Sequence, residues 1–435
     1  MYFSAFVFAA LAVLPSVVSA KSVFAHVVVG DTAAHDVTKW GNDILLAKNA
    51  GIDAFVLNIG FPDSNIPIQV ANAFRAAEQA GSAFKLFLAF DYLGGGQTWP
   101  ATGGETTSVV GLVNKYKNSA AYFKFNGLPF VSTFEGGTTN MADWAPNGPI
   151  RSGTGGIYFV PNWDGSGINA VKGALANIDG FFSWNMWPNG ATNKTTDNDF
   201  AWKNAIGSSK SYMMGVSPWF FHSGAGGLAP WVWRGDDLWA DRWAQTLTVQ
   251  PEFVQIVTWN DYGEAHYIGP IGAASEIPTG SGQYVNNMPH DSFRDFLPYY
   301  IARYKGSSFT ISRDQLQYWY RTAPAAGGQT CGVTGNSASQ GQSVVSPNQV
   351  MQDGIFFSAL LSADSVVTVQ IGSGPVVQKQ GKTGINHWSV PFNGQTGVPT
   401  FKVVRSGVTG KGTAITSSTT LASGCTNYNV WAGSA

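Results

Sequence analysis

The chain has 435 residues, of which only 12% are charged, and its formal net charge is −1. A chain with this balance and no cluster of Lys or Arg cannot neutralise a row of phosphates or an anionic bilayer, so nucleic acid and membrane surfaces are excluded as expected partners. It also holds 16 Trp, 15 Tyr and 28 Phe, which gives a neutral, aromatic-rich surface suited to uncharged ligands. The length predicts one barrel-sized domain and a smaller one.

Residues 1–20 have the pattern of a signal peptide. An apolar stretch from Phe3 to Leu14 is followed by Pro15 and a small-residue exit that ends at Ala20, although the usual positive start is missing. A membrane anchor needs about 20 apolar residues without a helix breaker, and this run is shorter and interrupted. We therefore predict cleavage after Ala20 and a secreted protein of the extracellular space or cell wall.

From Lys21 to about Arg321, short apolar runs alternate with helical stretches, as in a βα repeat with a parallel sheet. Two helices are clear: residues 66–81, which stop at a Gly, and residues 236–250, which end before Pro251. Eight unbroken apolar runs predict a (β/α)8 TIM barrel over residues 21–322. The runs are Val23–Val29, Ala54–Ile59, Lys85–Phe90, Phe130–Phe134, Gly156–Pro161, Gly180–Trp184, Tyr212–Val216 and Phe253–Trp259.

Carboxylates and Trp residues follow the ends of many of these runs. In such barrels the chemistry lies at the C-terminal ends of the strands. A single Asp or Asn there is more often a turn or cap residue, and a single Trp is more often core, but their coincidence on separate strands favours an active site. The residues concerned are Asp31, Asn58, Asp91, Tyr92, Glu135, Asn162, Trp163, Asp164, Trp184, Trp187, Trp219 and the run from Trp259 to Glu264.

Asp261 and Glu264 are the candidate catalytic pair. Glycoside hydrolysis needs one protonated and one ionised carboxyl group beside the scissile bond. A spacing of three residues on a loop that contains Gly263 lets both side chains point into the barrel mouth. We assign Glu264 as the acid, because neighbouring aromatic residues would desolvate it, and Asp261 as the base. Asp91 is a third acid that shares the base role or positions substrate or water.

A divalent cation bound by Asp261, Glu264 and His266 is the less favoured alternative for these side chains. The sequence has no second His at helical spacing, no HExxH motif and no EF-hand-like loop. It also lacks the GxSxG motif of a serine nucleophile. We therefore expect neither a metal nor a cofactor.

The last quarter of the chain changes pattern. After a short joint at residues 323–328, strands of period two with turn residues predict an antiparallel β-sandwich domain over residues 329–435. The expected strands are Gly354–Leu361, Ser365–Ile371, Gly374–Gln378, Asn386–Pro391 and Thr400–Ser406.

Two modifications accompany the predicted secretion. Cys331 and Cys425 are the only cysteines and are expected to form a disulfide, which by loop entropy would stabilise the fold by about 4–5 kcal/mol. The sequon at Asn193 predicts an N-glycan. Whether the C-terminal domain binds a polysaccharide through Trp388, Trp431 or Phe392, or only packs on the barrel, is left open.

Five motifs occur in order along the chain: Phe90–Leu93, Phe130–Gly136, Val216–Phe220, Arg234–Trp239 and Gln255–Ile268. Together they resemble the fungal α-1,3-glucanases, or mutanases, of glycoside hydrolase family 71. The resemblance implies inverting hydrolysis of α-1,3-glucan, with Asp91, Asp261 and Glu264 as the catalytic acids. The alternatives are a glycosidase of another polysaccharide and a catalytically silent glucan-binding protein.

The expected partner is the polysaccharide alone, bound by a monomer. A row of Trp and Tyr residues around an open rim predicts several stacked sugars and endo-cleavage. The expected substrate-binding residues are Trp259, Asn260, Tyr262, Tyr92, Glu135, Trp163, Trp184, Trp187, Trp219, Asp237 and His266.

Overall fold

The computed structural model describes the chain except for residues 1–20, 225–228, 419–420 and 422. The predicted signal peptide therefore lies outside the described residues. Within the described part, none of the helices has the length and apolar character needed to cross a membrane.

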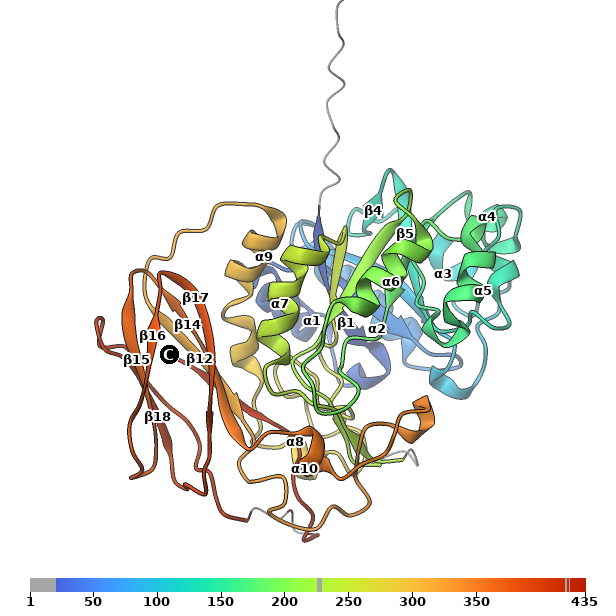
Figure 1. Cartoon of the computed structure of the whole chain (residues 1–435). Coiled ribbons are helices and arrows are strands. Elements are labelled where there is room, and N and C mark those ends of the chain that lie inside the picture. Colours follow the sequence, from blue (N-terminus) through green and yellow to red (C-terminus); the bar gives the residue numbers. More distant parts are fainter. Residues whose placement is uncertain (1–20, 225–228, 419–420, 422) are drawn as a thin grey trace, which may run out of the picture.

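A nine-stranded sheet forms the centre of the first region (Figure 1). Its hydrogen-bonded order is β4-β5-β3-β2-β1-β11-β8-β7, with β6 paired to β5, and all pairs are parallel except the β4–β5 hairpin. These strands are almost wholly buried, as expected for apolar runs covered on both faces. They are β1 (Ser22–Val28), β2 (Ala54–Ile59), β3 (Lys85–Asp91), β4 (Lys124–Phe125), β5 (Leu128–Phe134), β6 (Tyr158–Phe159), β7 (Gly180–Ser183), β8 (Ser211–Val216) and β11 (Phe253–Ile256).

The sheet curls so that its two ends approach each other. The Asp179 amide donates to the Phe159 carbonyl, and the Phe182 amide donates to the Pro161 carbonyl, both at 2.8 Å. The prediction of a mixed α/β region around a parallel sheet is confirmed. Three predicted strands are shorter than expected, since β6 has two residues, β7 ends at Ser183 and β11 ends at Ile256.

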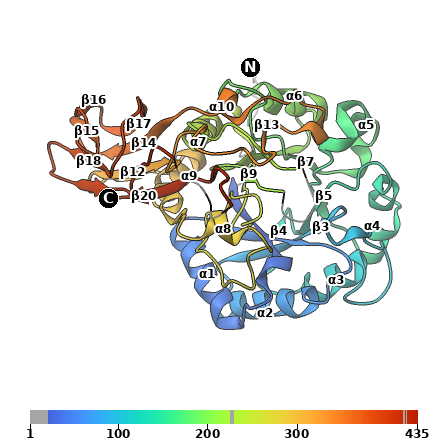
Figure 2. The same cartoon turned by 90° about the horizontal axis from the view of Figure 1, so that it is seen from below.

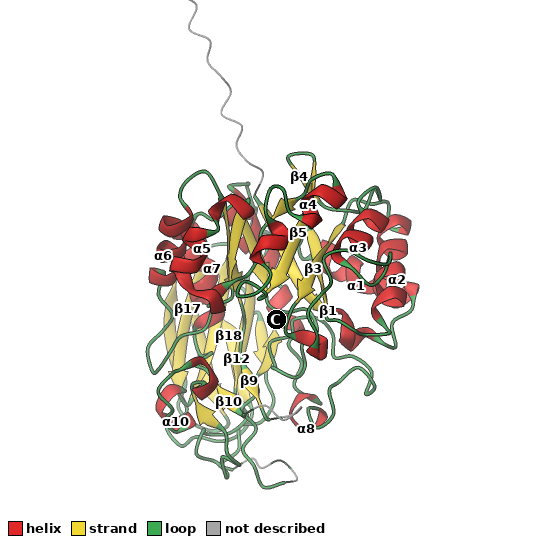
Figure 3. Cartoon of the chain, turned by 90° about the vertical axis from the view of Figure 1, so that its right-hand side faces the viewer, coloured by secondary structure: helices red, strands yellow, loops and turns green. Residues whose placement is uncertain are grey.

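Helices cover the outside of the curled sheet (Figures 2 and 3). The first begins at Asp36, whose side chain accepts from the Lys39 amide at 2.7 Å and so caps the free end of the helix. Both helices predicted from the sequence are present, with ends shifted by one or two residues. The helices are α1 (Val37–Asn49), α2 (Ile66–Gln79), α3 (Val109–Tyr116), α4 (Pro149–Thr154), α5 (Gly167–Gly173), α6 (Asp197–Ile206), α7 (Leu238–Val249), α8 (Gly282–Val285), α9 (Leu297–Lys305) and α10 (Pro347–Val350).

Two four-stranded antiparallel sheets make up most of the C-terminal region, in the orders β17-β14-β12-β20 and β16-β15-β18-β19. Apolar side chains of both sheets share one core, in which Tyr318 stacks on Phe401 with ring centroids 3.9 Å apart. The strands are β12 (Gln315–Tyr320), β14 (Gly354–Leu361), β15 (Ser365–Ile371), β16 (Val377–Gly381), β17 (Gly384–Pro391), β18 (Pro399–Val403), β19 (Thr409–Lys411) and β20 (Trp431–Ser434). A small third sheet joins β9 (Phe221–His222), β10 (Trp231–Val232) and β13 (Thr334–Gly335).

Strand β12 belongs to the C-terminal sheets, although the sequence prediction includes its residues in the barrel region. It pairs with β14 and β20 on either side. The strand follows α9 closely, and its pairing partners lie more than 30 residues later in the chain. A local pattern therefore could not assign it to its sheet.

Cys331 and Cys425 form the predicted disulfide. The bridge joins the start of the C-terminal region to the segment that leads into β20. Of the three aromatic residues considered for glucan binding, Phe392 is buried in the C-terminal core and has no free face, whereas Trp388 and Trp431 are partly buried against that core.

Candidate active site

Six carboxyl groups gather where the parallel strands end. Parallel strands carry their C-terminal ends to one side of a sheet, so the residues that follow them meet there. Each group lies close enough to influence the ionisation of the next: Asp31 with Asp261, Asp261 with Glu264, Glu264 with Asp91, Asp91 with Glu135, and Glu135 with Asp164. The structure therefore brings the predicted acids Asp261, Glu264, Asp91 and Glu135 into one site.

Asp261 and Glu264 stand on the loop after β11. The Asp261 amide donates to the Thr258 hydroxyl at 2.8 Å, and the Glu264 amide donates to Asp261 Oδ1 at 2.9 Å. The two side chains are 20% and 27% exposed. Both carboxyl groups thus remain accessible to a ligand, while the loop backbone holds them in place.

His266 lies beneath this pair and is fully buried. Its Nε2 is 2.8 Å from Glu264 Oε2 and its Nδ1 is 3.1 Å from the Thr258 hydroxyl. Burial lowers the pKa of His266 to about 4, which the charge of Asp261 only partly offsets, so the imidazole is neutral at ordinary pH. One His266 nitrogen and one oxygen from each acid lie within 4.8 Å of one another, and the hydrogen bond to Glu264 accounts for this approach.

The two acids differ in proton affinity. Burial raises the pKa of Glu264 to about 7, with a smaller lowering effect of His222 and a raising effect of Asp91. Burial also raises the pKa of Asp261 to about 6, where His266 and the backbone amides partly favour the ionised form. Glu264 therefore keeps its proton to higher pH than Asp261, which is the order that an acid and a base require.

Asp91, at the end of β3, accepts hydrogen bonds from the backbone of the loop that follows it. Its Oδ1 accepts from the Leu93 and Gly94 amides at 2.9 and 2.6 Å, and its Oδ2 accepts from Asn58 at 3.3 Å. A Cβ on Gly94 would come within 2.8 Å of this carboxyl group, so the loop needs glycine there. Two backbone amides thus hold Oδ1, while Oδ2 accepts one hydrogen bond and can accept a second.

Glu135 and Asp164 connect the loops after β5, β6 and β7. Glu135 has a left-handed backbone (φ 52°), and its Oε1 accepts from the Gly165 amide at 2.9 Å. Asp164 accepts from Asn162 Nδ2 at 2.6 Å and from the Trp184 amide. Burial raises the pKa of Asp164 to about 7. These acids organise the loops on the side of the site opposite β1.

Asp31 is a site residue that the sequence analysis noted at a strand end but did not assign to the site. Burial, and next the charge of Asp261, raise its pKa to about 8. The Asn260 side chain holds the turn before it, since Asn260 accepts from the Val28 amide and donates to the Val28 carbonyl, both at 2.9 Å. A second missed residue, His222 of β9, acts on Glu264 through its charge, and no local motif marks it.

Most of the Trp residues predicted to line an open rim are buried instead. Trp163, Trp187, Trp219 and Trp259 are at most 5% exposed. A ring enclosed by protein cannot stack on a sugar, so the prediction of a row of exposed Trp faces is wrong for these four. Trp163 packs against Phe159 and Trp259 against Phe55, and Trp187 Nε1 donates to the Trp219 carbonyl at 3.0 Å. Trp184 is only partly buried and keeps a surface for a ligand.

Three polar or aromatic residues expected to bind substrate are likewise buried and contact neighbouring parts of the protein. Asn260 is bound to β1, Tyr262 donates to the Pro270 carbonyl at 2.8 Å, and Tyr92 packs against Gly136, where a Cβ would lie 2.5 Å from the ring. They shape the loops that carry the acids.

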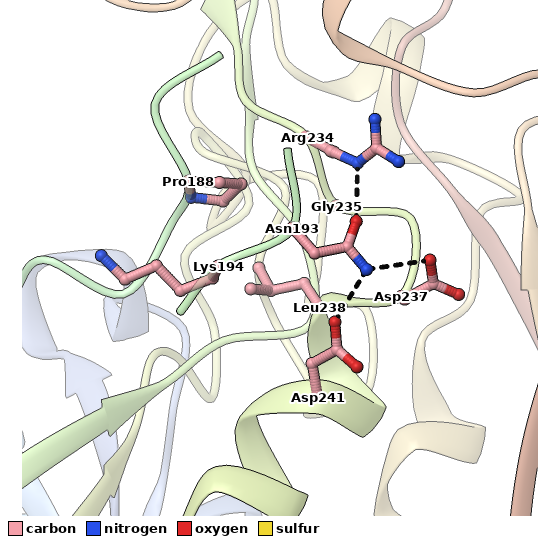
Figure 4. A pocket seen from close by; sticks show the side chains of 8 residues that line it. All are labelled: Pro188, Asn193, Lys194, Arg234, Gly235, Asp237, Leu238 and Asp241. Carbon is pink, nitrogen blue, oxygen red and sulfur yellow. Dashed lines mark hydrogen bonds between the residues drawn. The ribbon is translucent and has the colours of Figure 1, made fainter. Parts of the chain in front are cut away.

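Asp237 lies apart from the acids, in a pocket beside the loop between β7 and α6 (Figure 4). Its carboxyl group accepts from Asn193 at 3.3 Å and pairs with His387 of β17 at 2.9 Å, so it ties this loop to the C-terminal sheets. The amide of Asn193 also contacts Asp241 and Arg234. The predicted glycan at this Asn stays a prediction.

Accessible, paired carboxyl groups at the strand ends of a curled parallel sheet are the arrangement that glycoside hydrolysis requires. The sequence agrees: the chain belongs to glycosyl hydrolase family 71, whose model matches residues 19–435.

Two relatives align over most of the chain. It is 34% identical over 427 residues to the glucan endo-1,3-alpha-glucosidase agn1 of Schizosaccharomyces pombe, with 95% of this chain and 94% of that protein covered. It is 36% identical over 397 residues to the mutanase Pc12g07500 of Penicillium rubens, with 89% and 83% covered. Among solved structures, the GH99 endo-alpha-mannosidase from Bacteroides thetaiotaomicron matches with a TM-score of 0.45 at 14% identity, over 62% of this chain and 80% of that one.

Proposed function

We propose that this protein hydrolyses α-1,3-glucosidic bonds within α-1,3-glucan, with Glu264 as general acid and Asp261 as general base. The observation that carries the proposal is the accessible Asp261–Glu264 pair on the loop after β11, where burial raises the pKa of both carboxyl groups. The linkage is taken from the names of the relatives. In this mechanism Glu264 protonates the leaving oxygen and Asp261 takes a proton from the attacking water.

The proposed course at the anomeric carbon is inversion. Inverting glycosidases usually keep about 6.5–9.5 Å between the carboxyl groups, and retaining ones about 5–5.5 Å. The nearest oxygens of Asp261 and Glu264 are within 4.8 Å. An inverting water must therefore be held by the outer oxygens of the two carboxyl groups.

The substrate proposal is tested by incubating the protein with insoluble α-1,3-glucan, β-1,3-glucan, α-1,4-glucan and α-mannan, and measuring reducing sugar. We expect release from α-1,3-glucan alone, with oligosaccharides of several lengths because cleavage is internal. Release from another polymer but not from this one would overturn the substrate. Proton NMR of the first products from a soluble α-1,3-oligosaccharide should show the β-anomer, whereas the α-anomer would contradict inversion.

The pH dependence of kcat/KM follows from the two pKa values. The active form has Asp261 ionised and Glu264 protonated, so activity should fall below about pH 6 as Asp261 gains a proton and above about pH 7 as Glu264 loses one. A narrow bell with its maximum between these values is the expected result. The basic limb should vanish in Glu264→Gln when the residual activity is followed over the same range, and its persistence would assign the proton donor to another residue.

We also propose that the eight parallel strands close into a (β/α)8 barrel and that the two C-terminal sheets pack as a β-sandwich. The hydrogen bonds that residues 179 and 182 donate to the carbonyls of residues 159 and 161 support closure, and the shared core of Tyr318 and Phe401 supports the sandwich. The domains proposed are 21–322 and 329–435. Strand β12 lies within the first range but pairs with strands of the second. The protein is proposed to act outside the cell as a monomer, bearing a glycan at Asn193.

A further inference from the structure

The peptide bond between Gly263 and Glu264 stands between the two acids and is held on both edges. Its N–H, on Glu264, donates to Asp261 Oδ1 at 2.9 Å, and its C=O, on Gly263, accepts from the hydroxyl of Tyr284 at 2.8 Å. A peptide unit is planar and turns as one piece, so the bond on one edge fixes the direction of the other. The hydroxyl of Tyr284 thereby sets the direction of a hydrogen bond to the proposed base.

Tyr284 lies in the short helix α8, fully buried. Its hydroxyl is also 2.7 Å from Ser281 Oγ. A phenol has one proton and the Gly263 carbonyl can only accept, so Tyr284 gives its proton to Gly263 and receives one from Ser281. The hydroxyl is thus held by Ser281, and the Ser223 side chain also lies within hydrogen-bonding reach of it.

The C-terminal segment between Cys425 and β20 holds Tyr284 from the other side. Asn429, fully buried, donates from Nδ2 to the Tyr284 carbonyl at 2.9 Å and lies 3.3 Å from the hydroxyl of Tyr267. The backbone N–H of Asn429 donates to Asn427 Oδ1 at 2.9 Å. A segment more than 160 residues beyond the catalytic loop therefore contacts Tyr284, which in turn bonds that loop.

We propose that Tyr284 is a positioning residue for the reaction, which aligns the Glu264 N–H with Asp261 through the shared peptide, and that Asn429 holds Tyr284 in place for this task. The inference deepens the proposed function, because it takes Asp261 as the base. Neither residue touches the substrate.

A structural role alone would lower stability, whereas this role predicts a change in the titration of Asp261. The Glu264 N–H stabilises the ionised carboxylate, so loosening it raises the pKa of Asp261. The acid limb of the kcat/KM profile should then move to higher pH. The other titratable groups around Asp261 are Asp31, from the turn after β1, and Glu264 and the neutral His266 of its own loop. The substitutions below change none of them.

The test compares Tyr284→Phe and Asn429→Ala with Tyr428→Phe as the matched control. The control also removes a hydroxyl from a buried Tyr, 3.2 Å from the Ala325 carbonyl, in the same C-terminal segment but away from the loop. We expect Tyr284→Phe to lower kcat about tenfold, to leave KM within about twofold, and to move the acid limb upward by up to about one pH unit, the worth of one hydrogen bond. Asn429→Ala should move it in the same direction, and the double variant no further, because both act on one path.

If Tyr284→Phe folds and its acid limb lies at the same pH as that of the wild type, the proposal is overturned. If only Asn429→Ala leaves the limb in place, the part played by the C-terminal segment is overturned. Should Tyr284→Phe fail to fold, Asn429→Ala, which loosens Tyr284 without removing its hydroxyl, must move the limb instead, and an unmoved limb in that variant overturns the proposal. Full turnover in Asp261→Asn would refute the proposed function itself, a result that these variants do not produce.

Discussion

Asp261→Asn and Glu264→Gln are each expected to lower kcat by about two orders of magnitude or more, because each removes the proton transfer that its carboxyl group provides in the transition state. Both replacements are close in shape to the original, so the thermal unfolding midpoint should change little. Steady-state kinetics on α-1,3-glucan measures the loss. Glu105→Gln is the matched control, since this acid is exposed in a surface pair with Lys115.

The two roles are separated by changing the leaving group. A substrate whose leaving group needs no protonation should restore Glu264→Gln far more than Asp261→Asn, because only the first lacks a proton donor. The opposite pattern would exchange the assignments. If both variants kept near-native turnover, the catalytic pair would lie elsewhere among the six carboxyl groups of the site, and Glu135 would be the next residue to replace.

Asp199→Ala should lower the free energy of unfolding by about 3–5 kcal/mol, because it leaves a buried guanidinium without its counter-charge. Arg242 of α7 donates to both oxygens of Asp199 of α6 at 2.8 and 3.0 Å, and each side chain is 1% exposed. Asp199 also accepts from the hydroxyl of Tyr212 on β8 at 2.9 Å. The pair thus joins two helices to the sheet from within the core.

Urea unfolding followed by tryptophan fluorescence measures this loss. Glu105→Ala, which breaks the exposed pair with Lys115, serves as the comparison and should change the unfolding midpoint little, because water screens such pairs. An Asp199→Ala variant as stable as this control would show that the buried pair does not carry the stability assigned to it.

The sequence by itself determined the features that depend on neighbours in the chain. Unbroken apolar runs predicted the parallel strands, and the residues directly after them predicted where the acids lie, since a strand end and its loop are local. Asp91, Asp261 and Glu264 could be identified in this way, and so could the bridge between Cys331 and Cys425, because no other pairing of cysteines exists.

Only the tertiary structure decided which side chains are covered and what holds the catalytic loop. Trp163 and Trp219 follow strands just as Trp184 does, yet they are enclosed while Trp184 is not, because burial depends on the loops that fold over them. The contacts from Tyr284 to Gly263 and from Asn429 to Tyr284 span 21 and 145 residues. Local pattern cannot report such contacts, because each residue contributes only a hydrogen-bonding group, and the path of the whole chain selects its partner.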